Sequence, residues 1–201
     1  MVCSIADELI AMAELDQKVG DELATSGALY EGYHPRMAAI HENNALRLQA
    51  IIAQVGWPTE RLVGEQAAEA AWLIAQHAIS QPEFQRSSLK LLAEAAREHI
   101  VPLWQPAMLE DRIRVFEGRP QLYGTQLKPD AHGNMRPHAI EDPERVDERR
   151  RAVGLEPLAE RLARAEPQPL PADPERFERD YQTWLIEVGW RRRSEPDEGA
   201  A

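Results

Sequence analysis

DRIRVFEGRPQLYGTQ, residues 111–126, joins a helical pattern to a short polar segment that favours extended chain. Apolar residues recur at helical spacing over residues 104–117 and cover a little under half of the helical circumference. Gly118 is a suitable C-cap, and Pro120 cannot continue a helix. The sequence therefore predicts a core-facing helix that ends at Gly118.

The segment after this helix is typical of a small β-hairpin. Residues 121–126 contain strand-favouring Tyr and Thr, but they are too polar and too few for a core strand. His-Gly-Asn at residues 132–134 indicates a turn, and residues 135–140 can pair back. We predict a two-stranded hairpin within residues 121–140.

Arg112 falls inside the apolar stripe of the 104–117 helix, with Asp111 at the edge of that stripe. A guanidinium in that position needs a partner, because an unpaired buried charge costs several kcal/mol. Three interpretations remain open: a buried pair with a carboxylate, an arginine that forms a wall of a ligand pocket, or a side chain that reaches the surface.

A second informative stretch is the alanine-rich helix predicted over residues 65–78. Its alanines permit close approach of neighbouring helices, so we expect it to be central. Gln76 and His77 lie in its polar sector, which is either a solvated strip or the wall of a cleft, and Trp72 lies one turn from Gln76. His77 can act as an acid or base near neutral pH, or can simply form hydrogen bonds.

The fold class that these patterns predict is mainly α: a compact helical domain with one small β-hairpin near residues 121–140 and an appended C-terminal helix. We expect three parts of the chain. Residues 1–30 form an N-terminal helix, residues 31–165 form the core helical domain, and residues 166–201 contain a Pro-rich linker, an amphipathic helix and a disordered tail. The apolar stripe of that last helix predicts docking on its own domain or self-association.

Composition excludes several classes of protein. The net charge of −11, from 34 acidic and 23 basic residues, argues against binding to nucleic acids or anionic membranes. No apolar run approaches the roughly 20 residues of a membrane span, and the N-terminus lacks the pattern of a secretory signal. The single Cys3 excludes a disulfide framework. We therefore expect a cytoplasmic protein.

Metal ligands are sparse in the sequence. Cys3 alone cannot build a cysteine-ligated zinc site. His41 and Asn44 lie three residues apart on the inward side of a predicted helix, but the sequence reveals no third ligand near them. We therefore predict no metal and no cofactor.

Five motifs, in this order, are similar to those of a known family: GWP, WLIAQHA, PEFQ, DRIRVFEGRPQLYGTQ and IEDPERVDERR. With their spacing, they identify the chain as resembling a bacterial family of proteins of unknown function. The resemblance covers residues 44–162. It implies no activity, and the N-terminal helix and the segment after Pro167 look peculiar to this chain.

The polar residues of these motifs define the candidate site. They combine amides, a phenol, an imidazole and an ion pair, which suits a polar small molecule with amide, sugar or carboxylate groups. The predicted catalytic residues are His77 and Asp111, and the predicted ligand-binding residues are Trp72, Gln76, Arg112, Gln121, Tyr123 and Gln126. The chain contains no phosphate loop, dinucleotide fingerprint, metalloprotease helix or nucleophile elbow.

Two functions follow. In the first, the chain binds a polar small molecule, with hydrolysis or transfer as the chemistry of an enzyme, in a pocket between the alanine-rich helix and the YGTQ hairpin. In the second, it is a non-enzymatic protein-interaction module, and the same polar residues hold the helices in register. The sequence leaves open whether the protein is an enzyme.

Overall fold

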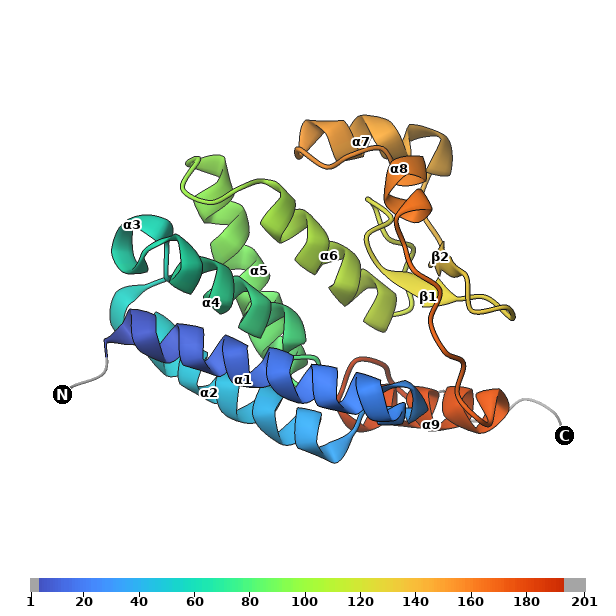
Figure 1. Cartoon of the computed structure of the whole chain (residues 1–201). Coiled ribbons are helices and arrows are strands. Elements are labelled where there is room, and N and C mark those ends of the chain that lie inside the picture. The colour runs from blue at the N-terminus through green and yellow to red at the C-terminus, as the bar shows by residue number, and fades with distance from the viewer. Residues whose placement is uncertain (1–3, 194–201) are drawn as a thin grey trace, which may run out of the picture.

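The computed structural model describes residues 4–193, which are mainly helical and contain one two-stranded antiparallel sheet (Figure 1). The fold class expected from the sequence is thus confirmed, including the C-terminal helix. The elements in chain order are α1 (Ile5–Ser26), η1 (Ala28–Glu31), α2 (Pro35–Val55), α3 (Glu60–Val63), α4 (Glu65–His77), α5 (Pro82–Arg97), α6 (Trp104–Phe116), β1 (Leu127–Pro129), β2 (Met135–Pro137), η2 (Pro143–Arg145), α7 (Val146–Ala152), α8 (Leu158–Ala163) and α9 (Pro174–Glu187).

Helix α1 has well-defined ends. The Ser4 hydroxyl accepts a hydrogen bond from the Asp7 N–H, and the Asp7 carboxylate accepts one from the Ser4 N–H, so both free donors are satisfied. Gly27 ends the helix in the left-handed conformation, with φ 80°. The chain then turns through η1 and returns as α2, which lies beside α1 (Figure 1).

Helix α4 is central, as its alanines predict. It contacts α1, α2, α5 and α6. Ala67, Ala71 and Ala75 are almost completely buried on it, and the small methyl groups let the neighbouring helices come close. The C-terminal end of α4, which carries His77, therefore lies at the meeting point of several helices.

The main core combines apolar side chains from α1, α2, α4, α5, α6 and the C-terminal segment. Leu9, Leu48 and Ile74 are inaccessible to solvent or nearly so. Fully burying a side chain of this size contributes about 1.5–3 kcal/mol. Because α1 supplies part of this core, it is an integral element of the domain.

The β-hairpin is present, but its first strand begins later than the sequence suggests. Strand β1 pairs with β2 in antiparallel register, with Lys128 opposite Arg136. Gln121 forms an isolated β-bridge with Ile140, and the residues after it form a loop. The N–H groups of Leu122, Tyr123 and Thr125 in this loop bind a side chain rather than a strand. Gly124 adopts φ +68° in this loop, and a Cβ there would lie 3.0 Å from the Ile140 side chain.

Helix α9 docks on its own chain near the ends of α1 and α2 (Figure 1). Leu185 is fully buried and Trp190 is 4% exposed, and both belong to the main core. The Trp190 indole N–H donates to the Ile79 carbonyl at 2.6 Å, and Arg191 donates to the Phe116 carbonyl. These contacts anchor the helix against the domain.

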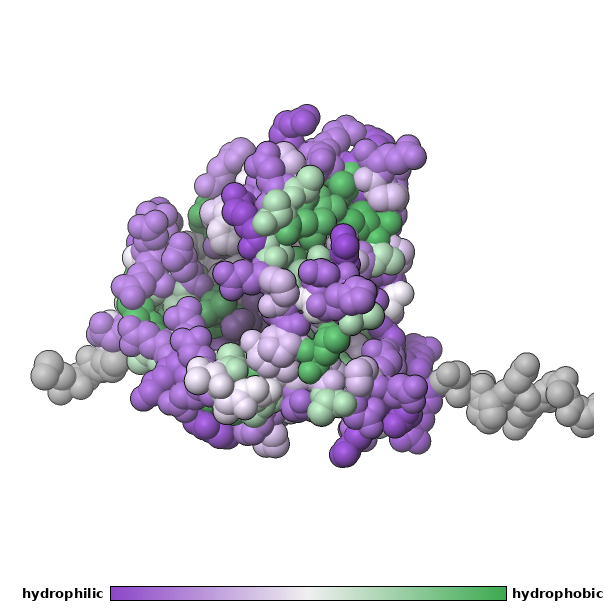
Figure 2. Space-filling model, turned by 45° about the vertical axis from the view of Figure 1, so that its right-hand side comes forward, coloured by the Kyte–Doolittle hydropathy of each residue, from purple (hydrophilic) through white to green (hydrophobic). Residues whose placement is uncertain are grey.

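Figure 2 shows a face on which hydrophilic side chains predominate and hydrophobic ones gather in separate patches. Among the residues that the structure describes, none of the helices is long and apolar enough to span a lipid bilayer.

Candidate functional site

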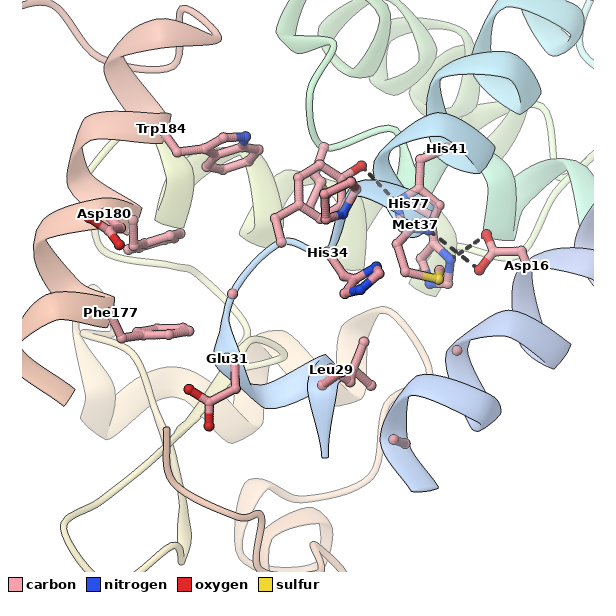
Figure 3. A pocket seen from close by; sticks show the side chains of 18 of the residues that line it. Asp16, Leu29, Glu31, His34, Met37, His41, His77, Phe177, Asp180 and Trp184 are labelled. Atoms are coloured by element: carbon pink, nitrogen blue, oxygen red, sulfur yellow. Dashed lines mark hydrogen bonds and ion pairs between the residues drawn. The ribbon is translucent and has the colours of Figure 1, made fainter. Parts of the chain in front are cut away.

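A pocket of about 860 Å³ lies between α1, the segment from η1 to the start of α2, and α9. We call it the α1–α9 pocket. Figure 3 shows Phe177 and Trp184 projecting into it from α9. Asp16, His41 and His77 lie together on the opposite side. Helices distant in sequence thus build a hollow with an aromatic wall and a polar floor.

The floor of the pocket is a cluster of three side chains from α1, α2 and α4. Asp16 Oδ2 lies 2.8 Å from His77 Nδ1, and Asp16 Oδ1 lies 3.4 Å from His41 Nε2. The two imidazole centroids are 5.1 Å apart. Asp16 and His41 are buried, whereas the His77 side chain is 30% exposed. The cluster therefore has one accessible side, at His77.

The surroundings of this cluster shift the pKa values of Asp16 and His77. Burial alone would raise the pKa of Asp16, but its close contacts with the imidazoles of His41 and His77 outweigh burial, so the pKa of this carboxyl lies well below its ordinary value. Burial lowers the pKa of His77, against the opposing effect of Asp16. The surroundings therefore favour the charged form of the Asp16 carboxyl and disfavour the charged form of the His77 imidazole.

Tyr33 orients the second imidazole. Its hydroxyl lies 2.9 Å from His41 Nδ1, and the two rings stack with centroids 5.7 Å apart. Burial raises the pKa of the Tyr33 hydroxyl, so it stays protonated. With Nδ1 engaged by Tyr33, the other ring nitrogen of His41 faces Asp16.

The opposite wall is a row of aromatic side chains on α9. Phe177, Tyr181 and Trp184 lie at helical spacing on one side of this helix, and successive rings stack. Trp184 also meets the ring of Tyr33 edge-on, with centroids 5.5 Å apart. Asp180 lines the same wall. The pocket can thus enclose a flat or apolar group beside the polar cluster.

Asp111, which the sequence suggests as a catalytic partner of His77, has another role in the structure. Its fully buried carboxylate accepts hydrogen bonds from the N–H groups of Leu122, Tyr123 and Thr125 at 2.6–3.1 Å, and from the Thr125 hydroxyl. It therefore folds the loop between α6 and β1. The carboxylate that meets His77 belongs to Asp16 instead.

Gln121 and Gln126 complete this loop. The Gln121 side-chain amide donates to the carbonyls of Gln126 and His138, and its oxygen accepts from the Gln126 N–H. The Tyr123 carbonyl accepts from Arg150 at 2.6 Å. These residues thus lie in a hydrogen-bonded network outside the α1–α9 pocket, in which the Gln121 side chain bonds to backbone groups and the Gln126 side chain bonds to other side chains.

Arg112 connects the loop to the end of α4. Its Nη1 donates to the Gln76 carbonyl at 2.7 Å, and its Nε donates to Gln126 Oε1 at 3.2 Å. Within residues 4–193, no carboxylate lies within ion-pair distance of it. Burial lowers the pKa of Arg112 to about 10, so it remains a cation at neutral pH. Its charge also helps to lower the pKa of His77.

The two remaining predicted residues also lie outside the pocket lining. The side-chain amide of Gln76 is buried, without a hydrogen-bond partner among the described residues. Trp72 packs edge-on against Trp104, with ring centroids 4.8 Å apart, beside a separate and smaller hollow. Of the predicted site residues, His77 alone lines the α1–α9 pocket.

Asp16, Tyr33 and the α9 wall are the parts of the site that the sequence analysis missed. Asp16 shares the buried face of α1 with Leu9, Ala13, Val19 and Leu23. An acid inside an apolar stripe is the same signal that marked Arg112, so the sequence did contain a pointer to it. The sequence also places His41 on the inward side of its helix, but spacing along the chain does not show that Asp16 lies beside it.

Comparison with known proteins places the chain in one family. The model of DUF6624, a family of unknown function, matches residues 3–167, which confirms the resemblance seen in the motifs. The match includes α1, so the expectation that the N-terminal helix is peculiar to this chain is wrong. Helix α9 lies beyond the matched residues. No curated protein and no solved structure matches the chain.

Proposed function

The chain belongs to DUF6624, a family of unknown function, and we propose that it binds a polar small molecule in the α1–α9 pocket. The observation that carries the proposal is the Asp16–His41–His77 cluster at the floor of an aromatic-walled hollow of about 860 Å³. Binding sites for small molecules typically occupy roughly 300–1,000 Å³ and combine apolar walls with a few convergent polar groups.

The charges around the pocket favour a neutral or cationic molecule. Four carboxylates line it, from Asp16, Asp21, Glu31 and Asp180. No Lys or Arg occurs among the lining residues that the structure describes. A phosphate or carboxylate group would therefore meet repulsion, whereas an amine or hydroxyl would find acceptors. An amine could also lie against the aromatic rings of α9 through cation–π contacts.

Acid–base catalysis is the second candidate, and the Asp16–His77 contact favours it. A carboxylate that orients an imidazole is the arrangement by which enzymes prepare a histidine to take a proton from a substrate. The part of the His77 ring that Asp16 leaves free is accessible from the pocket. Hydrolysis and group transfer are the reactions that such a base would serve.

The alternative of a non-enzymatic interaction module draws its support from the loop network. The Asp111 carboxylate binds backbone N–H groups of the loop, and Gln121 bonds to the backbone of Gln126, as a scaffold requires. The proposal also covers the cellular location and the self-association of the chain. A cytoplasmic setting is favoured by the single cysteine. Self-association through α9 would have to use its outer face, because Leu185 is buried within its own chain.

A thermal-shift screen with a metabolite library, run in the presence of a chelator, tests the proposal. A ligand that binds only the folded state raises the melting temperature. We expect amines or polyols among the compounds that stabilise the wild-type protein. Their effect should vanish in Asp16→Asn and Phe177→Ala, which change the floor and the wall, and persist in the control Trp104→Ala, outside the pocket.

Failure would have two forms. In one, no compound stabilises the wild-type protein. In the other, the shift survives in both pocket variants, which would place the ligand elsewhere on the molecule.

A further inference from the structure

We propose that Asp16, His41 and His77 bind one divalent transition-metal cation at the floor of the α1–α9 pocket. The inference deepens the proposed function. The role of the ion beside a bound molecule rests on that proposed function. The ion site itself depends only on the three side chains. It replaces the expectation from the sequence that the chain holds no metal.

The spacing of the three side chains suits a single ion. One ligand atom from each lies within 4.8 Å of the other two. Bonds of about 2.1 Å at tetrahedral angles separate neighbouring ligand atoms by roughly 3.4 Å. The 3.4 Å contact of Asp16 with His41 matches that value, and the 2.8 Å contact of Asp16 with His77 is shorter. Small side-chain rotations would therefore admit the ion.

His41 supplies the second and independent observation. Its side chain is 8% exposed, and its Nε2 has no hydrogen-bond partner among the described residues. That nitrogen lies 3.4 Å from the Asp16 carboxylate but outside hydrogen-bond geometry. Leaving a buried polar atom unpaired costs about 1–3 kcal/mol, so an unpaired buried nitrogen usually has a structural or functional explanation. A cation between Nε2 and the carboxylate would satisfy both.

Tyr33 provides the outer contact that metal-binding histidines typically have. Its hydroxyl engages His41 Nδ1 at 2.9 Å, which fixes the ring and leaves Nε2 to face the site. A ligating histidine almost always uses its second nitrogen in this way, and the contact sets both the tautomer and the orientation of the ring. Tyr33 would thus act as a positioning residue.

The accessible side of the cluster determines the kind of site. Structural zinc sites surround the ion with four protein ligands, whereas catalytic sites use three and leave a position open. Here three side chains converge, and the His77 ring is 30% exposed on the pocket side. The open position would face the pocket and take an oxygen or nitrogen atom of the bound molecule, or water.

The ligand atoms define the class of cation. Two imidazole nitrogens and one carboxylate oxygen suit Zn²⁺, Fe²⁺, Co²⁺, Ni²⁺ or Mn²⁺, whereas Ca²⁺ and Mg²⁺ prefer all-oxygen surroundings. The pocket carboxylates of Asp21, Glu31 and Asp180 favour a cation. Arg112 opposes it, because its positive charge disfavours further positive charge at His77. The affinity therefore depends on the three ligands themselves.

The cluster also fits a second account, in which Asp16 simply holds two histidines through hydrogen bonds. On that account His77 Nδ1 carries a proton that it donates to the carboxylate. On the metal account Nδ1 binds the ion, and the ring proton moves to Nε2. The two accounts differ in whether the protein takes up a metal.

Titration of the full-length, chelator-treated protein with Co²⁺ tests the proposal, because coordination by imidazole changes the visible absorption of this ion. Calorimetry with Zn²⁺ gives the stoichiometry. We expect one ion per chain, and at least tenfold weaker binding in Asp16→Asn, His41→Gln and His77→Gln. Tyr33→Phe should weaken binding by about tenfold, because it removes an outer contact. His34→Asn is the control, since it changes a lining histidine outside the cluster.

Absence of Co²⁺ and Zn²⁺ binding to the folded wild-type protein would overturn the inference. So would equal binding by the three ligand variants, with circular dichroism confirming that they are folded. The test is separate from that of the proposed function. If compounds bind in chelator but the protein takes up no metal, the proposed small-molecule pocket stands and the ion site is wrong. If the protein takes up metal but no compound binds, the ion site stands and the proposed small-molecule pocket is wrong.

Discussion

The carboxylate of Asp16 lies 2.8 Å from Nδ1 of His77, although the two residues are 61 positions apart in the chain. The contact joins α1 to the C-terminal end of α4. The carboxylate is almost fully buried, whereas the imidazole is 30% exposed to the pocket. A buried charge therefore supports an accessible ring, which is the arrangement that a binding or catalytic site needs.

Asp16→Asn should destabilise the metal-free protein by about 1–3 kcal/mol at pH 7. The substitution keeps the shape of the side chain but removes the charge that both histidines contact, and losing a partner inside a protein costs about this much. Urea unfolding of the variant and the wild type, both in chelator, measures the difference. Equal unfolding midpoints would show that the cluster contributes nothing to stability.

Arg112→Ala should lower the free energy of unfolding by about 1–3 kcal/mol. The loss comes from two neutral acceptors, the Gln76 carbonyl and Gln126 Oε1, because no carboxylate pairs with Arg112 within the described residues. The matched control is Arg119→Ala, whose half-exposed side chain contacts Glu117 and should matter by less than about 1 kcal/mol. A loss of about 3–5 kcal/mol for Arg112→Ala would instead indicate a buried ion pair.

Asp111→Ala should be among the most destabilising single changes, by at least about 3 kcal/mol. Its removal leaves the N–H groups of Leu122, Tyr123 and Thr125 without their acceptor, at about 1–3 kcal/mol for each that stays dry. Asp130→Ala removes a similar contact from the exposed hairpin turn and should cost much less. Chemical denaturation of both variants provides the comparison. A loss for Asp111→Ala no larger than that for Asp130→Ala would contradict the scaffold role.

The stability of the protein should fall as the pH drops from about 6.5 to about 4, in part because of His138. Burial, aided by the charge of Lys128, lowers the pKa of His138 to about 4. The unfolded chain therefore takes up the proton first, since its histidine has the ordinary pKa of about 6.5. The contribution of His138 is complete above pH 6.5 and is lost as the pH falls through the folded-state pKa.

Unfolding free energies across this pH range test that sign. His138→Gln should show a shallower loss than the wild type between pH 6.5 and pH 4. His132→Gln, in the exposed turn, serves as the control. Parallel curves for the wild type and His138→Gln would contradict the lowered pKa.

Trp190→Ala should loosen α9 and destabilise the protein by about 3–5 kcal/mol. The indole is 4% exposed, packs against Phe116 and donates to the Ile79 carbonyl, so its removal leaves both a cavity and an unpaired acceptor. Truncation after Pro167 should expose the same apolar surface and promote aggregation. Thermal melts and light scattering measure both effects. A truncated protein as stable and as monodisperse as the full chain would show that α9 is not part of the domain.

The helical elements and the role of α4 could be predicted because they depend on local patterns. Alanines over most of one helix indicate a central position, and Gly133 between His132 and Asn134 indicates the hairpin turn. The sequence predicts too early a start for the first strand, because Tyr123 and Thr125 favour strands. In the structure their N–H groups bind the Asp111 carboxylate, a tertiary contact that overrides the propensity.

The candidate site was predicted only in part, because distance in space does not follow from spacing in sequence. His77 was identified from its polar sector, but its partner comes from α1 and its opposite wall from α9. Asp111 accompanies His77 in the motifs, which suggests a shared role, but in the structure its carboxylate reaches from α6 to hold the loop that follows this helix. An acid within the apolar stripe of α1, Asp16, was the signal that could have been used.

Histidine-ring NMR during a Zn²⁺ titration tests most directly whether Asp16, His41 and His77 form one binding site. The chain has six histidines, so each ring can be followed separately. We expect the nitrogen signals of His41 and His77 to change together, at one equivalent of metal, while those of the other four stay constant, and we expect no such change in Asp16→Asn. Unchanged signals for His41 and His77, or responses only from histidines outside the cluster, would contradict the account.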